Sequence, residues 1–342
     1  MARHWARSSA LLIQPLPATL RISSPHLARF AMAALAPCIQ LNDGNYIPVV
    51  ALGTGRGTIK ETETIDEVRK AVFWAIEAGY RHIDTAAIYG DEEQVGQGIA
   101  EAINKGIVTR DQLFITTKLW NDHHSRDKVV PALRESLRRL GLSYVDLYLI
   151  HFPISEKSDG SPDNIDYLET WEGMQEAKEL GLALSIGVSN FNMTQIGRLV
   201  ENSPVKPAVH QFEVNPTMTQ EPLVALCQRL GITVMAYSPF GFVVSRKDGP
   251  SPPPKYDDPT LVALANKYGK SVGQILLRYL VERGLVPIPK STNKARIAEN
   301  IDIFDFQLTE NEVATINRFN KNVRVINPKD YQDYPNYPFE RD

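Results

Sequence analysis

Four polar residues that could together donate a proton lie at or just beyond the ends of short apolar runs. Asp84 is next to last in the run RHIDT, Lys118 ends LFITTK, His151 ends VDLYLIH, and Tyr89 lies five residues past Asp84. A tyrosine has a pKa of about 10, too high for ready proton donation at neutral pH, but a nearby ammonium group stabilises the phenolate. We therefore expect Lys118 to lower the pKa of Tyr89, Asp84 to hold Lys118 in place, and His151 to orient a substrate oxygen.

Each of these residues taken singly is more often structural. An Asp at a strand end is commonly a cap or an ion-pair partner, a His after an apolar run is commonly a satisfied core residue, and a loop Tyr usually packs. Their joint occurrence at three successive apolar runs favours a catalytic site, because polar residues at the carboxyl ends of barrel strands meet at one face.

Eight apolar runs would supply the strands that position these residues. Nearly continuous apolar runs are typical of parallel strands buried on both faces, and they lie at residues 48–52, 81–85, 113–118, 145–151, 184–190, 208–214, 232–238 and 285–290. Amphipathic segments such as 65–80 alternate with them and end at glycines, for example Gly79. The pattern predicts an α/β fold, a single (β/α)8 TIM barrel. A doubly wound open sheet is the alternative, disfavoured because no GxGxxG turn follows a strand.

The barrel is expected to span residues 35–342, with a β-hairpin at 38–48 built on the turn Asp43-Gly44. Residues 1–34 carry four arginines, many serines and no acidic residue, so they are either a mitochondrial transit peptide or an extension upstream of a cytosolic start, which we favour. Two long segments, 238–258 and 320–342, are expected to form loops at the carboxyl face that wall a substrate pocket. The alternative is a solvated linker and a frayed tail. In the first loop Phe240, Phe242 and Val243 look exposed.

The composition argues against two classes of partner, nucleic acids and membranes. A net charge of −3 offers no basic footprint for nucleic acid, and no apolar run reaches the roughly 18 residues of a membrane span. Two cysteines, Cys38 and Cys227, suit a reducing compartment, and we expect a cytoplasmic protein, or a mitochondrial one if residues 1–34 direct import. The seven histidines show no ligand spacing, so no metal site is expected, and His123-His124 should be solvated.

Several motifs in register resemble the signatures of the aldo-keto reductase superfamily. They are GYRHIDTAAIYG (79–90), TKLW (117–120), DLYLIH (146–151), GVSNF (187–191) and PKS (289–291), and the resemblance covers about residues 38–342. It implies NADPH-dependent reduction of a ketone or aldehyde by hydride transfer, in a monomer that acts on a small-molecule carbonyl substrate. By position, Tyr89 would be the general acid, with Asp84, Lys118 and His151 completing a tetrad.

The resemblance also implies the residues that bind NADPH. Those assigned to the nicotinamide, the pyrophosphate, the 2′-phosphate and the adenine are, in chain order, Ser189, Asn190, Gln211, Tyr237, Ser238, Lys290, Ser291, Arg296, Glu299 and Asn300. Lys290 and Arg296 agree with a phosphate ligand, because a lysine and a bidentate arginine suit its charge and shape. The loop at 53–57 departs from the family pattern, which puts cofactor or substrate contacts there in doubt.

Two features narrow the substrate. Steroid double-bond reductases of the family carry Glu at the position of His151, so histidine favours carbonyl reduction. Trp120, Phe152 and Phe242 predict an apolar pocket, and the stretches SPFGFVVSR and YQDYPNYPF resemble those of 3-dehydroecdysone reductases. The alternatives are a general aldehyde or xenobiotic carbonyl reductase and a barrel that binds NADPH without catalysis. An unrelated barrel, such as a phosphate-dependent isomerase, is a further alternative, but the Gly-rich phosphate motif that it needs is lacking.

Overall fold

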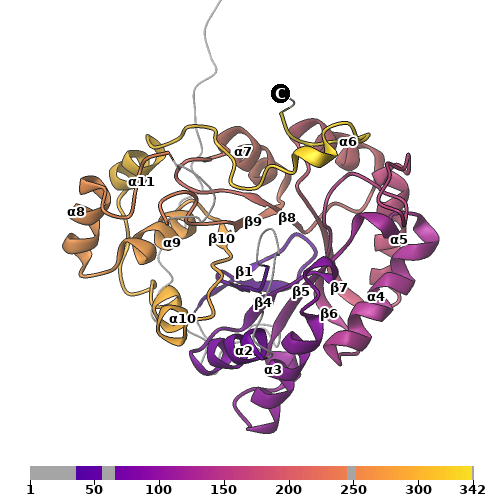
Figure 1. The fold of residues 1–342 in the computed structure, drawn as a ribbon, viewed down its shortest axis with the longest axis horizontal. Helices are drawn as coiled ribbons and strands as arrows, with labels where there is room; N and C mark the ends of the chain where they lie inside the picture. The colour runs from indigo at the N-terminus through magenta and orange to yellow at the C-terminus, as the bar shows by residue number, and fades with distance from the viewer. Residues whose placement is uncertain (1–35, 56–65, 245–251, 341–342) are drawn as a thin grey trace, which may run out of the picture.

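Eight parallel strands form a barrel with helices around it, and an antiparallel hairpin precedes the barrel (Figure 1). The computed structural model describes residues 36–55, 66–244 and 252–340, so the extension at 1–34 lies outside the described residues. The hairpin strands are β1 (Cys38–Gln40) and β2 (Tyr46–Pro48). The barrel strands are β3 (Leu52–Gly53), β4 (His82–Asp84), β5 (Phe114–Leu119), β6 (Val145–Ile150), β7 (Ala183–Ser189), β8 (Val209–Glu213), β9 (Thr233–Tyr237) and β10 (Val286–Pro287).

The barrel is closed, as predicted. Neighbouring strands pair in parallel from β3 to β10. The ring is completed where the backbone N–H groups of Ala51 and Gly53 donate to the carbonyls of Pro287 (3.2 Å) and Pro289 (3.0 Å). The open doubly wound sheet is therefore excluded, and every strand end at the carboxyl face points toward one shared mouth.

The predicted first strand, 48–52, was wrong at its start. Pro48 belongs to the hairpin, where it pairs with Cys38, and the N–H of Val49 still donates to the carbonyl of Pro37 (3.0 Å). The barrel strand begins only at Leu52. The apolar run continues through both elements because the hairpin packs into the barrel, so hydrophobicity alone does not mark the boundary.

Helices cover the outside of the barrel (Figure 1). They are α2 (Glu67–Glu77), α3 (Glu92–Asn104), α4 (Arg126–Leu140), α5 (Tyr167–Glu179), α6 (Met193–Asn202), α7 (Glu221–Leu230), α8 (Pro259–Tyr268), α9 (Val272–Glu282), α10 (Lys294–Ile301) and α11 (Glu310–Asn317). The helix predicted within 65–80 is confirmed as α2, whose buried residues follow the 3, 4 spacing of an amphipathic helix. Gly79 follows it with φ of +100°, the left-handed region in which glycine avoids the Cβ clash. None of the described helices is long and apolar enough to cross a membrane.

The hairpin closes the amino end of the barrel. Leu41 and Ile47 join the core inside the barrel, where they pack with residues such as Val209. The amides of Asn42 and Asn45 fasten the hairpin by donating to backbone carbonyls of the barrel wall at 2.8 and 3.1 Å. With this end filled, the carboxyl face is left for the functional site.

The loop after β9 is less exposed than the sequence suggested. Val243 is 1% exposed and belongs to the core between barrel and helices, and Phe240 packs against that core. Residues 245–251 of the same loop lie outside the described residues. The C-terminal segment, drawn in yellow, runs past α7 and α6 with its short helix η4 (Lys329–Tyr331) (Figure 1).

Candidate active site

The carboxyl ends of β4, β5 and β6 bring three of the predicted catalytic residues together. Asp84 ends β4, Lys118 lies near the end of β5 and His151 directly follows β6. The Nζ of Lys118 donates to Oδ1 of Asp84 (2.7 Å) and to the carbonyl of Thr85 (2.9 Å). Lys118 is fully buried and Asp84 is 3% exposed, so each charge depends on the other for compensation.

Tyr89 lies over this ion pair at the end of the 3-10 helix η1 (Ala87–Tyr89). The Nζ of Lys118 is 5.2 Å from the centroid of the Tyr89 ring, and the His151 ring meets it edge-on at 5.6 Å. A Cβ added to Gly55 would come within 2.7 Å of Cζ of Tyr89, so the glycine makes room for the phenol end. The four predicted residues therefore form one cluster, and part of Tyr89 reaches the surface.

The surroundings of Tyr89 raise its pKa well above the ordinary value of 10. Burial is the largest cause, and the negative charges of Asp84 and Asp91 add to it. The net change in the pKa is therefore opposite to the lowering expected from Lys118, because burial and the two carboxylates outweigh its charge. Tyr89 is thus a protonated O–H donor throughout the neutral range.

His151 is a neutral imidazole among aromatic rings. Its pKa lies well below the ordinary value because burial, and next the charge of Lys118, disfavour the imidazolium. The Phe152 ring stacks on it at 5.5 Å and the Trp120 ring meets it at 5.2 Å. Its Nδ1 is buried without a hydrogen-bond partner among the described residues. A buried ring nitrogen in this condition is suited to accept a bond from, or donate one to, a ligand.

Asn190 links three strand ends at the mouth. It follows β7 with φ of +62°, a left-handed conformation that asparagine tolerates better than most residues. Its Nδ2 donates to the carbonyl of His151 (2.9 Å) and to Oγ of Ser189 (3.2 Å), and its Oδ1 accepts from the hydroxyl of Tyr237 (2.8 Å). Three of the predicted nicotinamide-binding residues are therefore joined to a predicted catalytic residue.

Gln211 belongs to the same network. Its Nε2 donates to Oδ2 of Asp84 (2.8 Å), the carboxylate oxygen that Lys118 leaves free. Ser238 begins the loop after β9 in the left-handed region, with φ of +48°. Gln211 therefore lies in the middle of β8, and Ser238 directly follows β9.

The residues predicted to bind the adenosine phosphate lie on one short stretch of chain, from the end of β10 into α10. Lys290 and Arg296 are exposed, and Ser291 is 6% exposed. Glu299 and Asn300 are three and four residues beyond Arg296, which places them on the same side of the helix. Arg296 lies in the first turn of α10, where the helix dipole also favours anions, and Lys290 precedes the helix by four residues; two such cations are suited to a phosphate.

A supporting layer behind the cluster was missed from the sequence. The hydroxyl of Thr85 donates to Oδ1 of Asp91 (2.8 Å), and that of Thr117 donates to Oε1 of Glu92 (2.6 Å). Glu92 is 1% exposed and is paired with Arg139 at 2.6 Å. The available signal was that both acidic residues come directly after Tyr89-Gly90, at the start of a helix.

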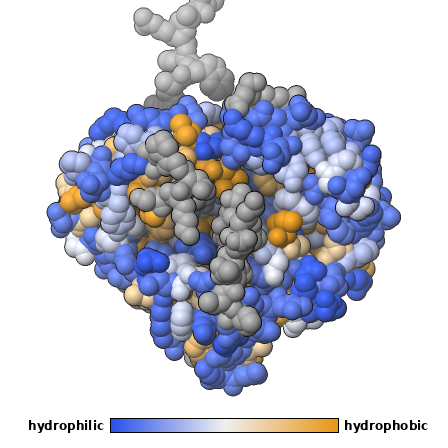
Figure 2. Space-filling view, viewed as in Figure 1, coloured by the Kyte–Doolittle hydropathy of each residue, from blue (hydrophilic) through white to orange (hydrophobic). Residues whose placement is uncertain are grey.

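Aromatic side chains from three segments, those after β5 and β6 and the C-terminal one, form a wall beside the cluster. Phe152 and Ile154 pack with residues of the C-terminal segment. The rings of Phe152 and Phe339 meet at 6.2 Å, and Nε1 of Trp120 donates to Oε1 of Glu156 (2.8 Å). On the face drawn in Figure 2, hydrophobic residues lie toward the middle and hydrophilic ones around the periphery. Phe242 is half-buried and, among the described residues, makes no ring contact with this wall, so its place in the pocket stays a prediction.

The two adjacent histidines were both predicted to be solvated, and the prediction was wrong for His124. His123 is partly exposed and bound to Asp122, but His124 is 1% exposed and burial lowers its pKa to about 3. It lies just after η3 (Asn121–His123), where the chain turns inward before α4. In the part of the chain that the structure describes, no group of His, Cys, Asp and Glu could hold a metal ion.

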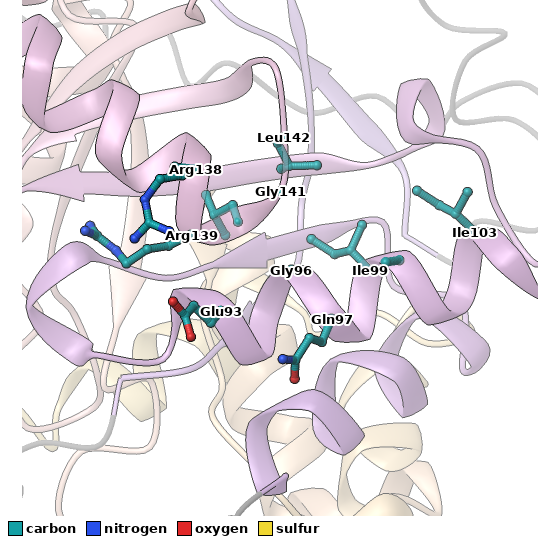
Figure 3. A pocket seen from close by; sticks show the side chains of 11 residues that line it. Glu93, Gly96, Gln97, Ile99, Ile103, Arg138, Arg139, Gly141 and Leu142 are labelled. Atoms are coloured by element: carbon teal, nitrogen blue, oxygen red, sulfur yellow. The ribbon is translucent and has the colours of Figure 1, made fainter.

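A hollow of about 420 Å³ lies away from this cluster, between α3 and α4 (Figure 3). None of the predicted site residues lines it. Its two arginines, Arg138 and Arg139, are paired with Glu135 and Glu92. Arg139 connects the lining to the supporting layer through Glu92, but not to any of the four residues of the cluster.

Comparison with known proteins matches the chain to one family throughout the barrel. The model described as "Aldo/keto reductase family" matches residues 49–321. Among similar proteins, aldo-keto reductase AKR2E4 of Bombyx mori is 76% identical over 90% of this chain and 100% of its own length, and human aldo-keto reductase family 1 member A1 is 39% identical over 89% and 98%. Among solved structures, Bombyx mori AKR2E4 in complex with NADP superposes with a TM-score of 0.87 over 89% of this chain and 99% of that one, at 76% identity. A second, AKR2E5 complexed with NADPH, has a TM-score of 0.87 at 47% identity, over 89% and 94%.

Proposed function

The chain belongs to the aldo/keto reductase family, and on this premise we propose that it reduces a bulky hydrophobic ketone, such as 3-dehydroecdysone, through Tyr89, Asp84, Lys118 and His151. The coarser statement follows from the family and the relatives: the protein is an NADPH-dependent oxidoreductase that acts on small-molecule carbonyls. The observation that supports the finer proposal is the meeting of a phenol, a buried ion pair and a neutral imidazole beside an aromatic wall.

The residues at the mouth fit a nicotinamide cofactor. Ser189 and Asn190 at the end of β7, and Gln211 beside Ser189 in β8, offer hydroxyl and amide groups that suit a carboxamide. Lys290 and Arg296 offer the charge for a phosphate at the start of α10. When bound there, NADPH supplies the hydride that reduces the carbonyl carbon.

Tyr89 provides the proton in this proposal. Its high pKa keeps the phenol protonated, and it does not prevent transfer, because the alkoxide that develops on the substrate oxygen is a much stronger base than a phenolate. Lys118, 5.2 Å from the ring centroid, offsets the negative charge that is left on the phenol oxygen. Asp84 holds that ammonium group in position.

His151 orients the substrate. As a neutral imidazole it carries one ring N–H that can donate to the carbonyl oxygen without adding a buried charge. Trp120 and Phe152 pack against its ring and limit its rotation. The carbonyl oxygen would then lie between the phenol of Tyr89 and the imidazole.

The aromatic wall supports a large apolar substrate. Trp120 and Phe152 contact the His151 ring, Tyr337 and Phe339 pack in the same cluster, and burying apolar area contributes about 25 cal/mol per Å². The alternatives are a general carbonyl reductase, which would use the same residues with small aldehydes, and a barrel that binds NADPH without turnover. The complete tetrad argues against the last of these.

The test compares two substrates. NADPH oxidation is followed at the nicotinamide absorbance with 3-dehydroecdysone and with a small aromatic aldehyde, and NADPH binding is measured separately by fluorescence. A kcat/KM for the ketone at least about tenfold above that for the aldehyde, which corresponds to about 1.4 kcal/mol, supports the proposal. Turnover of the aldehyde alone would replace it with the general reductase, and binding without any turnover would replace it with the inactive barrel.

We also propose that the protein is a monomer located in the cytoplasm. The exposed large hydrophobic residues, such as Leu180 and Tyr256, come from separate elements rather than from one helix face. Sedimentation equilibrium of the full chain tests the first statement. Imaging of the tagged full chain tests the second, and mitochondrial staining would assign residues 1–34 to import.

A further inference from the structure

We propose that Glu213 is a positioning residue that holds the C-terminal segment, residues 321–340, against the barrel and thereby controls the entry of bulky substrates. The inference rests on the proposed function for its substrate, but its geometry is independent of that function. Glu213 ends β8, is 0% exposed, and belongs neither to the tetrad nor to the predicted cofactor site.

The carboxylate of Glu213 is fully used by neighbouring donors. Its Oε1 accepts from the backbone N–H of Val325 (2.7 Å) and from Nδ2 of Asn215 (2.9 Å). Its Oε2 accepts from the backbone N–H of Ile326 (3.0 Å). A buried carboxylate is costly unless it is hydrogen-bonded, and backbone amides bound to a charged acceptor are held more strongly than those bound to a neutral one. Two of the three donors belong to the C-terminal segment.

The two ends of the segment are joined next to this carboxylate. Nε of Arg324 pairs with Oε2 of Glu340 (3.0 Å), and its guanidinium group lies 4.2 Å from the centroid of the Phe339 ring. The hydroxyl of Tyr337 donates to Oδ1 of Asn327 (2.9 Å). Residues 324–340 therefore form a closed loop whose ends meet where Glu213 binds the backbone.

The loop carries half of the aromatic wall. Phe339 and Tyr337 pack on Phe152, whose ring stacks on His151. The far side of the loop is held by α6, where Nε2 of Gln195 donates to the carbonyl of Asn336 (2.7 Å). If the bonds at Glu213 are lost, the loop stays tethered at α6, but the wall beside His151 is free to shift.

The position of Glu213 in the sheet connects the wall to the predicted cofactor site. Glu213 is the register partner of Tyr237 in the pairing of β8 with β9. Tyr237 in turn donates to Asn190, which binds the carbonyl of His151. One carboxylate thus lies between a residue predicted to face the nicotinamide and the loop predicted to face the substrate.

The first test removes the charge with little change of shape. Glu213→Gln replaces one carboxylate oxygen with an NH₂ group. Two backbone N–H groups and the NH₂ of Asn215 need acceptors at this position, so at least one hydrogen bond is replaced by two donors that face each other. We expect the ratio of kcat/KM for 3-dehydroecdysone to that for a small aromatic aldehyde to fall roughly tenfold, mainly through a higher KM for the ketone, as for loss of a charged hydrogen bond. A matched control is Glu312→Gln, because Glu312 also binds a backbone N–H, that of Thr309, but on the outer helix α11. The control should leave the ratio unaltered.

A second measurement does not depend on turnover. Lys321, Arg324 and Lys329 are tryptic sites in the segment, and Glu213→Gln should speed cleavage there at least about tenfold under native conditions, since opening of the loop becomes easier. Glu340→Gln removes the carboxylate that pairs with Arg324 at the other end of the loop. It replaces Glu213→Gln in this measurement if the first variant fails to fold. A folded Glu213→Gln or Glu340→Gln protein with wild-type cleavage and an unaltered substrate ratio would overturn the proposal. If the wild type reduces neither substrate, the proposed function fails, while the cleavage rates still decide the role of Glu213.

Discussion

Replacing Gly55 with alanine should reduce turnover while leaving the fold intact. The added Cβ would lie 2.7 Å from Cζ, 2.9 Å from Cε2 and 3.0 Å from the hydroxyl oxygen of Tyr89. Ordinary contact begins at 3.4 Å, so the phenol end has to retreat by about 0.7 Å. Because it is the free end of a side chain that moves, we expect a stability loss below about 1 kcal/mol. A displacement near 1 Å at a reacting group costs on the order of 10²-fold, so kcat should fall by about 10- to 100-fold.

The assay is the steady-state kcat for NADPH oxidation with a saturating aromatic aldehyde, together with the thermal unfolding temperature. The matched control is Gly197→Ala in α6, where an added Cβ meets nothing within 4 Å, so turnover should match the wild type. In a Tyr89→Phe background the Gly55 substitution should cost less than about threefold, because the hydroxyl that it displaces is already gone. Full activity of Gly55→Ala, or an equal loss in both backgrounds, would refute the reasoning.

Three further predictions concern stability. Lys118→Met leaves Asp84 buried without its cation and should lower the free energy of unfolding by about 3–5 kcal/mol; a loss below about 1 kcal/mol in urea titration would contradict this. Gly187→Ala places a Cβ 2.3 Å from the carbonyl oxygen of Val209, which as backbone cannot move aside, and should cost about 1–3 kcal/mol by the same titration, whereas wild-type stability would show that β7 can shift. Burial lowers the pKa values of four histidines below 6.5 in the folded protein, so below about pH 6.5 the unfolded chain binds more protons than the folded one. The free energy of unfolding should therefore decrease as the pH is lowered from about 6.5, by up to about 1.4 kcal/mol per pH unit for each histidine. An unchanged urea midpoint between pH 6.5 and 5 would count against this prediction. The four are His82, His124, His151 and His210.

Much of the site followed from position along the strands. In a parallel barrel the carboxyl ends of all strands share one face, so Asp84, Lys118 and His151 had to converge once the eight runs were recognised. The helix in 65–80 followed from hydrophobic spacing alone, since its buried face is set by packing on the sheet. These inferences needed only local patterns and the topology they imply.

Other features depend on contacts that local patterns do not contain. The pKa of Tyr89 rises mainly because the side chain is buried and next because the charges of Asp84 and Asp91 lie close by, and these surroundings are three-dimensional. His124 is buried although its neighbours in the chain are polar. Glu213 is part of an apolar-looking strand, and its backbone partners lie more than a hundred residues away.

The most direct test of the account is the kcat of Tyr89→Phe beside Tyr268→Phe. Tyr268 is a control because the same substitution removes a phenol hydroxyl there, one that donates to Glu312 at the end of the outer helix α8. With NADPH and a saturating aromatic aldehyde, Tyr89→Phe should lose roughly 10²-fold or more in kcat while it binds NADPH within about threefold of the wild type, and Tyr268→Phe should turn over at the wild-type rate. A folded Tyr89→Phe protein with wild-type kcat would show that Tyr89 is not the proton donor and contradict the account.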